Sequence, residues 1–236
     1  MQQNLYPRRI LLSHTTNTRD LGGYQTSNNK ITNYGRIIRS DVPNNFSKED
    51  FKIMERYHIY AAIDVRGDKH FKETANAYQT IKEIQFYHIP ITGGFKELAE
   101  LEKNSKEHSY LSIVEMHKPE FLRVFQVIAQ QNDGAVIYNC KAGKDRTGII
   151  SALILSLCGV PESDIIADYE ISYTLNYEKF PFEEGNERSN YFLSPPEYMR
   201  NFLAYIHQKY QNAAGYLADI GLTQEEIQQI KTKLLQ

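Results

Sequence analysis

One ten-residue stretch, with the sequence NCKAGKDRTG at residues 139–148, constrains the fold more than any other part of the chain. The apolar run at residues 135–138 is typical of a short buried strand, and the run at residues 149–157 is typical of an apolar helix. The stretch is therefore expected to be a loop that leads from a strand into the N-terminus of a helix. Unpaired backbone N–H groups and the positive end of the helix dipole gather there. The sequence thus predicts a binding site for a phosphate group.

Cys140 stands at the start of this loop, close in sequence to three cations, Lys141, Lys144 and Arg146. Nearby cations and a helix N-terminus favour the thiolate form, so the Cys140 thiol is expected to be partly ionised at neutral pH. A thiolate beneath a phosphate cradle is a nucleophile directed at phosphorus. Arg146 ends in a planar guanidinium that can bind two phosphate oxygens at once. We therefore interpret Cys140 as a nucleophile and Arg146 as a phosphate-binding residue.

Alternative roles for Cys140 fit the sequence less well. A nucleotide P-loop of the form G-x-x-x-x-G-K-[ST] would need Gly at position 138 and Ser or Thr at position 145, where the chain has Tyr138 and Asp145. A zinc site would need a second Cys or His two to four residues away, and the sequence has none there. A disulfide to Cys158 would have to span roughly 18 Å of helix, against a tolerated ~7 Å between Cα atoms. A structural buried cysteine is the alternative for Cys140 taken alone.

The chain resembles the bacterial atypical phosphatases of the protein tyrosine phosphatase superfamily. The loop has their C-x-A-G-K-D-R-T-G signature, and NTRDLGGY at residues 17–24 is similar to their N-x-R-D-L-G-G-Y motif. The run IDVR at residues 63–66, the pair DY at residues 168–169 and the end of the chain at residues 215–235 are also similar to motifs of that family, in the same order. The resemblance implies a metal-independent phosphatase without a cofactor. It also implies a phosphocysteine intermediate and a substrate among phosphotyrosine, phosphoserine or phosphothreonine, and phosphoinositides.

The resemblance points to Asp145 as the general acid that protonates the leaving oxygen. Many tyrosine phosphatases carry this Asp on a separate loop before the cysteine, but residues 92–132 contain no Asp. Asp64 and Asp68, expected on a facing loop, are the alternatives, and a structural carboxylate is the other interpretation of Asp145. The hydroxyl of Thr147 is expected to donate a hydrogen bond to the thiolate when that thiolate leaves.

Backbone donors of the loop are expected to form the rest of the phosphate cradle. The predicted phosphate-binding residues are Lys141, Ala142, Gly143, Lys144, Asp145 and Arg146. Two lysine ammonium groups at the mouth favour an anionic substrate such as a phosphoinositide head group, and solvated lysines are the alternative. Asn139 stands where the superfamily usually has His, so an imidazole contribution to thiolate stability is missing.

Four charged residues outside the loop belong to the similar motifs. An ion-pair frame around the loop is expected from Arg19, Asp20, Asp64 and Arg66, with a structural role as the favoured interpretation. Asp64 and Cys140 both follow predicted strands, and ligands of open α/β sheets bind beyond the carboxyl ends of strands. We therefore expect the two motifs to meet at one edge of a sheet.

Strands predicted at residues 36–39, 59–63 and 85–89 alternate with helical segments. This alternation predicts an α/β fold, tyrosine-phosphatase-like, with a central mostly parallel sheet and helices on both faces. A single domain over residues 1–236 is expected, with the polar, Lys/Glu-rich residues 92–118 as a mobile lid. Capping boxes, each formed by an N-cap and an N3 residue, are predicted for Ser47 with Asp50, Ser194 with Glu197, and Thr223 with Glu226.

Composition narrows the class of protein further. The net charge of −2 gives no reason to expect binding to nucleic acid. No apolar run is long enough for stable membrane insertion, and residues 1–12 lack the apolar core of a signal peptide, so a cytoplasmic protein is expected. Two cysteines fit a reducing compartment. The expected partner is a phosphorylated protein or a phosphoinositide, and the oligomeric state is not indicated.

Two rival functions use the same loop differently. A phosphate-binding pseudophosphatase would recognise phosphorylated partners without turnover. The intact Cys140, Asp145, Arg146 and Thr147 argue against it, and Asn139 argues mildly for it. A rhodanese-type sulfur transferase would also use a loop cysteine, but the Arg-Thr pair that follows the loop argues against that activity.

Overall fold

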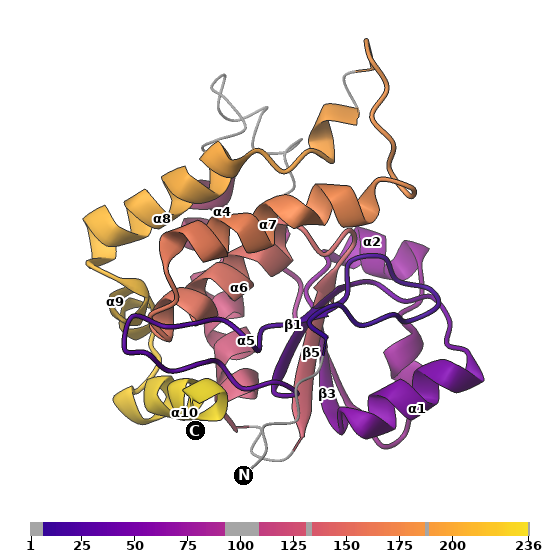
Figure 1. Ribbon diagram of the computed structural model, residues 1–236, viewed down its shortest axis with the longest axis horizontal. Helices are drawn as coiled ribbons and strands as arrows, with labels where there is room; N and C mark the ends of the chain where they lie inside the picture. Colours follow the sequence, from indigo (N-terminus) through magenta and orange to yellow (C-terminus); the bar gives the residue numbers. More distant parts are fainter. Residues whose placement is uncertain (1–6, 93–108, 131–133, 187–188, 236) are drawn as a thin grey trace.

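A five-stranded sheet lies at the centre of the protein, in the order β1-β2-β5-β3-β4 (Figure 1). The structure is a computed structural model that describes residues 7–92, 109–130, 134–186 and 189–235. The strands are β1 (Arg19–Asp20), β2 (Ile37–Asp41), β3 (Ile59–Asp64), β4 (Gln85–His88) and β5 (Ala135–Cys140). β1 pairs antiparallel with β2, whereas β2, β5, β3 and β4 pair in parallel. The predicted mostly parallel sheet is therefore confirmed.

Helices cover both faces of this sheet (Figure 1). On one side lie α1 (Lys48–Arg56) and α2 (Asp68–Glu73), and a short 3₁₀ helix, Ala77–Thr80, precedes β4. Among the described residues, the other α-helices are α4 (Ser109–Met116), α5 (Lys118–Gln130), α6 (Asp145–Leu157), α7 (Glu162–Asn176), α8 (Pro196–Tyr210), α9 (Ala213–Asp219) and α10 (Gln224–Leu235), and a second 3₁₀ helix spans Ser189–Tyr191. The two-sided covering confirms the predicted α/β class.

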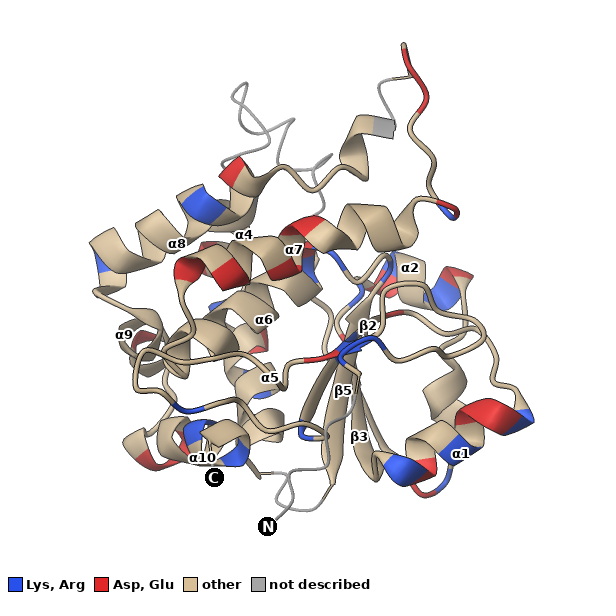
Figure 2. Ribbon diagram, in the orientation of Figure 1, with Lys and Arg blue, Asp and Glu red and all other residues tan. Residues whose placement is uncertain are grey.

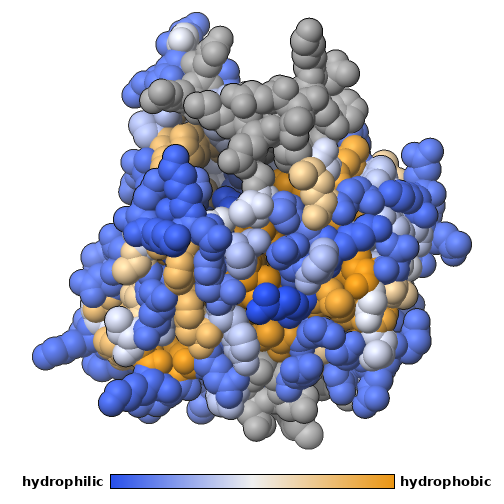
Figure 3. All heavy atoms as spheres, turned by 180° about the vertical axis from the view of Figure 1, so that it is seen from behind, coloured by the Kyte–Doolittle hydropathy of each residue, from blue (hydrophilic) through white to orange (hydrophobic). Residues whose placement is uncertain are grey.

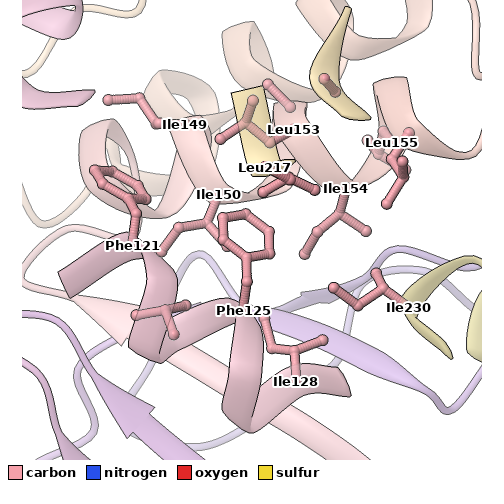
Figure 4. Close-up of a cluster of buried hydrophobic side chains, with 14 of the residues drawn as sticks. Phe121, Phe125, Ile128, Ile149, Ile150, Leu153, Ile154, Leu155, Leu217 and Ile230 are labelled. Carbon is pink, nitrogen blue, oxygen red and sulfur yellow. The ribbon is translucent and has the colours of Figure 1, made fainter. Parts of the chain in front are cut away.

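The larger hydrophobic core lies between the sheet and α5 and α6. Phe121, Phe125 and Ile128 of α5 lie beside Ile150 and Ile154 of α6 (Figure 4), and all five side chains are fully buried. Side chains alternate along β5, so its two faces serve different cores: Val136 and Tyr138 join this cluster, whereas Ala135 and Ile137 join a smaller one under α1. β5 is thus buried on both faces, which fixes the position of the loop that follows it.

Charges of both signs lie on the face of the molecule that Figure 2 shows. Acidic and basic residues are interspersed along helices such as α1 and α10 (Figure 2). On the back of the molecule, apolar residues lie in small patches separated by hydrophilic ones (Figure 3). Among the helices of the described residues, none has the length and apolar character needed to cross a bilayer.

The predicted lid at residues 92–118 is only partly covered by the structure. Residues 93–108 lie outside the described residues. Residues 109–116 form α4, and its buried Tyr110, Ile113 and Val114 belong to the larger core. This apolar i, i+3, i+4 spacing was hidden in the polar composition of the whole segment. The end of the segment is thus a packed helix, and a lid over residues 92–118 stays a prediction.

Candidate active site

Cys140 is the last residue of β5 and lies at the carboxyl edge of the parallel strands. Its register partner on β2 is Asp41, and Asn139 beside it is paired with Asp64 of β3. The Cys140 side chain is buried, with a relative exposure of 2%. Residues 141–144 then lead directly into α6, which begins at Asp145. The strand, loop and helix predicted from the sequence are thus present, and Asp64 and Cys140 meet at one edge of the sheet as expected.

The backbone carbonyls of the loop are held by donors on the protein side. Asn17 donates from its side chain to the carbonyls of Ala142 (2.9 Å) and Gly143 (3.0 Å). Asn176 of α7 donates to Ala142 at 2.9 Å, and Arg39 of β2 donates to Gly143 at 2.8 Å. These two carbonyls are therefore turned toward the body of the protein.

The orientation of the carbonyls also fixes the orientation of the N–H groups. In a trans peptide the C=O and N–H bonds point in opposite directions, and the chain has no cis peptide bond among its described residues. The N–H groups of Gly143 and Lys144 therefore point away from the protein body, to the outer side of the loop. Together with the N-terminus of α6 they can form a cradle of donors for an anion.

Gly143 allows the loop to lie close to β2. Its φ of +63° is a left-handed conformation that side chains disfavour. A Cβ atom at this position would lie 2.6 Å from backbone atoms of Ser40 and Asp41. A glycine is needed here for both reasons, since the loop could not otherwise pack against the strand.

Arg146 and Thr147 lie in the first turn of α6. The half-buried Arg146 donates from Nη1 to the Ile91 carbonyl at 3.2 Å, and its other donors have no partner within the described ranges. The hydroxyl of Thr147 is fully buried and likewise has no hydrogen-bond partner among the residues that the structure describes. An unpaired buried donor such as the Thr147 hydroxyl is costly, and both side chains have donors that no described residue engages.

The carboxylate of Asp145 faces a buried tyrosine. The hydroxyl of Tyr110 on α4 donates to Oδ1 of Asp145 at 2.5 Å, and the Lys144 ammonium lies 3.4 Å from the same oxygen. Tyr110 itself is completely buried. From the sequence, Phe95 and Tyr110 are candidates for an aromatic wall around a substrate ring. Phe95 lies outside the described residues, and Tyr110 instead contacts Asp145 from inside the core.

The two lysines of the loop have different surroundings. Lys141 is exposed to solvent. Lys144 is 2% exposed, and its ammonium donates to the carbonyls of Tyr191 and Leu193, both at 2.6 Å. The expectation that both ammonium groups stand at the mouth of the loop is therefore corrected for Lys144, whose charge is withdrawn to hold the connection between α7 and α8.

The expected ion-pair frame exists in a different arrangement. Arg19 pairs with Asp168 of α7 at 2.8 Å, and Arg39 pairs with the same carboxylate. Burial alone would raise the pKa of Asp168, but the charges of Arg19 and Arg39 outweigh it and hold that pKa below its ordinary value. Tyr24 also donates to Asp168, at 2.9 Å. Two guanidinium groups thus share one carboxylate in a buried cluster.

Asp20 does not belong to this ion-pair frame, so that expectation is wrong. Its carboxylate accepts backbone N–H bonds from Gly22 (2.8 Å) and Gly35 (2.6 Å). Adjacent residues of a strand point to opposite faces, so Asp20 cannot face the partner of Arg19. Burial raises the pKa of Asp20 to about 6, although the two backbone donors oppose the rise.

Asp64 and Arg66 form a separate buried pair. Arg66 donates to the Asp64 carboxylate from Nε and from Nη2, the latter at 2.7 Å. Asn76 donates both to Asp64 (2.9 Å) and to Oδ1 of Asn139 (3.1 Å). Asp68 lies apart from this pair, with a side chain that is 66% exposed. Asn139 is therefore held through Asn76, and Asp64 has a structural rather than a free carboxylate.

Sequence patterns alone did not reveal several residues that hold the loop. These are Arg39, Asp41, Asn76 and Asn176. Asp41 is completely buried and accepts hydrogen bonds from the backbone of Thr16 and Asn17, which places the Asn17 side chain under the loop. The sequence signal that could have revealed Arg39 and Asp41 is the run RSD at the end of β2. Two charged residues in a buried strand need partners.

Comparison with known proteins gives the family of the chain. The chain matches the tyrosine phosphatase family over residues 10–236 and belongs to this family. A tyrosine-protein phosphatase of Nostoc commune is 38% identical over 147 residues, which are 56% of this chain and 49% of that protein. The triple specificity protein phosphatase PtpB of Mycobacterium tuberculosis is 27% identical over 120 residues, 42% of this chain and 44% of that protein. The matches thus span about half the length of these relatives.

Solved structures show a more distant similarity. TpbA of P. aeruginosa in complex with phosphotyrosine has a TM-score of 0.45 and 14% identity, and the alignment covers 83% of this chain and 91% of that chain. The catalytic core of Siw14 has a TM-score of 0.36 and 15% identity, with 80% of this chain and 93% of that chain covered. The family resemblance drawn from the sequence motifs is confirmed by the family match.

Proposed function

We propose that this protein is a cysteine-dependent phosphatase that hydrolyses phosphate monoesters through a phosphocysteine intermediate. The observation that carries the proposal is the orientation of the loop after Cys140. Its Ala142 and Gly143 carbonyls are tied back by Asn17, Asn176 and Arg39, which leaves the N–H groups of the loop to bind phosphate oxygens above the sulfur. Such a cradle stabilises the charge of a phosphoryl group during transfer.

The reaction has two steps. The Cys140 thiolate attacks phosphorus, the bond from phosphorus to the ester oxygen breaks, and Asp145 gives its proton to the leaving oxygen. Water then attacks the phosphocysteine, its proton passes to Asp145, and the sulfur leaves as a thiolate together with inorganic phosphate. Arg146 binds two nonbridging oxygens, and the buried hydroxyl of Thr147 donates to the thiolate.

The surroundings of the three carboxylates favour Asp145 as the acid. Asp64 is engaged by two nitrogens of Arg66 and by Asn76, so its oxygens are already occupied by hydrogen bonds. Asp68 is exposed on a different element. Asp145 begins α6 beside Arg146 and is only partly exposed, which allows it to reach a leaving group bound in the cradle.

Phosphotyrosine is the first substrate that we propose. The relatives carry the names tyrosine-protein phosphatase and triple specificity protein phosphatase. Phosphoserine, phosphothreonine and phosphoinositides, which the resemblance of the sequence motifs implies, are further candidates. The withdrawal of Lys144 leaves Lys141 as the exposed lysine of the loop, which weakens the argument for a head group with several phosphates.

Turnover of p-nitrophenyl phosphate in EDTA tests the proposal. Cys140→Ser should abolish turnover while retaining binding of phosphate or vanadate. Cys158→Ser is the matched control, because Cys158 is buried at the far end of α6 and burial raises its pKa to about 12. Iodoacetate should inactivate the wild type and the Cys158 variant alike, and phosphate should protect both. Binding without turnover in the wild type would instead favour the pseudophosphatase.

A panel of phosphotyrosine, phosphoserine and phosphoinositide substrates then ranks the candidates. Activity with thiosulfate, in the absence of activity with phosphate esters, would support the sulfur transferase instead. If Cys140→Ser retained more than a small fraction of phosphatase activity, covalent catalysis by this residue would be excluded.

A further inference from the structure

Tyr110 reaches the active site from the hydrophobic core. It lies on α4, has no exposed surface and belongs to the larger core cluster. Its hydroxyl donates to Oδ1 of Asp145 at 2.5 Å, across 35 residues of sequence. A buried phenol that donates its single proton to a carboxylate makes a strong, charge-assisted hydrogen bond.

A second tyrosine supports the first one. The hydroxyl of Tyr169 on α7 lies 2.7 Å from the Tyr110 hydroxyl. A phenol has one proton to donate. Because Tyr110 gives its proton to Asp145, Tyr169 must be the donor in the second bond. The chain of donation therefore runs from Tyr169 to Tyr110 to Asp145, and successive bonds of this kind strengthen one another.

Both phenols remain protonated at physiological pH. Burial raises the pKa of Tyr110 well above its ordinary value, and the negative charge of Asp145 raises it further. The pKa of Tyr169 is also raised, first by burial and then by the charge of Asp145. Tyr110 thus stays a donor, and it does not itself become a base.

The two oxygens of Asp145 are in different surroundings. The Tyr110 hydroxyl donates to Oδ1, and the Lys144 ammonium lies 3.4 Å from the same oxygen. Within the part of the chain that the structure describes, Oδ2 has no hydrogen-bond partner. We propose that Tyr110 is a positioning residue for Asp145: it occupies Oδ1, so that the proton delivered to the leaving group is carried on Oδ2 and the carboxyl group cannot rotate. This inference rests on the proposed function of Asp145.

Substitution of the hydroxyl alone tests the inference. Tyr110→Phe keeps the ring in the core and removes the bond to Asp145. Tyr216→Phe is the matched control, because Tyr216 is also completely buried and also donates to α4, to the Val114 carbonyl at 3.0 Å. The readout is kcat/KM for phenyl phosphate and for p-nitrophenyl phosphate, since the poorer leaving group depends more on the proton.

The expected result is a selective loss. Tyr110→Phe should lower kcat/KM for phenyl phosphate roughly tenfold more than for p-nitrophenyl phosphate, part of the ~10²–10⁴-fold range of general acid catalysis. Tyr216→Phe should leave the ratio unchanged. In an Asp145→Asn background, Tyr110→Phe should cause no further change in the ratio, because the group that it positions is absent.

Several results would overturn the inference. Equal losses on both substrates would show that Tyr110 only packs, and an undiminished effect in the Asp145→Asn background would show that Tyr110 does not act through Asp145. If Tyr110→Phe failed to give a cooperative thermal transition, Tyr169→Phe would carry the test, with a smaller loss in the same direction expected and no selective loss contradicting it. A normal leaving-group ratio in Asp145→Asn itself would remove the acid role from Asp145, whereas no turnover in the wild type would reject the proposed function as a whole.

Discussion

Arg39 donates from Nη2 to the carbonyl oxygen of Gly143 at 2.8 Å, across 104 residues of sequence. The same guanidinium pairs through Nη1 with Asp168 and is completely buried. The loop that follows Cys140 therefore rests on a charged cluster in the interior. With Arg19 as the second cation, this cluster carries more positive than negative charge. That excess favours an anion on the other side of the loop.

Arg39→Met should be strongly destabilising. The substitution leaves Asp168 with one cation in place of two and removes a donor from the Gly143 carbonyl. Breaking a buried ion pair on one side costs about 3–5 kcal/mol. We expect a loss of this size in the free energy of unfolding, measured by urea denaturation, together with weaker phosphate binding.

Arg200→Met is the control for that experiment. Arg200 lies 3.7 Å from Glu197 on the surface of α8, and both side chains are more than half exposed. An exposed pair of this kind contributes about 0–1 kcal/mol. Similar losses in the two variants would contradict a supporting role of Arg39 beneath the loop.

Gly143→Ala should disrupt the phosphate cradle. The positive φ of an alanine there would cost about 1–2 kcal/mol, and its Cβ would in addition contact backbone of Ser40 and Asp41 at 2.6 Å. Gly185→Ala is the control, because Gly185 has a φ of +78° and a Cβ added there would meet no atom within 4 Å. Phosphate binding, measured by calorimetry, should be lost in the first variant and kept in the second. Unchanged binding in both would show that the loop can move away from β2.

The local parts of the fold were predictable from the sequence. The capping boxes of Ser47 with Asp50 and of Thr223 with Glu226 are confirmed, because the two residues of each are three positions apart and need no other element. The predicted box at Ser194 is wrong. Pro195 takes the N-cap position, so α8 begins one residue later than the pattern requires.

The non-local parts of the site were not predictable in the same way. Asn176 and Arg39 contact the loop from α7 and β2, and neither stands at a spacing that marks it. Arg19 was expected in one ion-pair frame with Asp20, Asp64 and Arg66, but its partner is Asp168, and side chains alternate along a strand, so Asp20 points to the other face. Residues whose roles depend on one continuous stretch could be predicted from the sequence. The residues of distant elements that hold the loop could be identified only from the structure.

The Asp20 carboxyl should contribute less to the free energy of unfolding as pH rises, which is the opposite of the usual behaviour of an Asp. Burial raises its pKa from 3.8 to about 6 in the folded protein, so the folded state binds more protons than the unfolded state between these values. Stability contributed by the neutral carboxyl is therefore lost as pH rises from about 4 to about 6, by roughly 2–3 kcal/mol. The difference in unfolding free energy between wild type and Asp20→Asn should fall over this window. A difference that rises with pH would show that the backbone donors of Gly22 and Gly35 outweigh burial.

The two lysines of the loop should respond differently to the same substitution. Lys144→Met removes the donor shared by the Tyr191 and Leu193 carbonyls, so it should cost about 1–3 kcal/mol of stability and lower activity on every substrate alike.

Lys141 is exposed, and Lys141→Met should leave the melting temperature unchanged. An exposed charge is screened by salt, so its removal should raise KM for a phosphoinositide more than for a phosphotyrosine peptide, and most at low ionic strength. Equal changes in KM for both substrates would mean that Lys141 affects the loop itself and does not contact the head group.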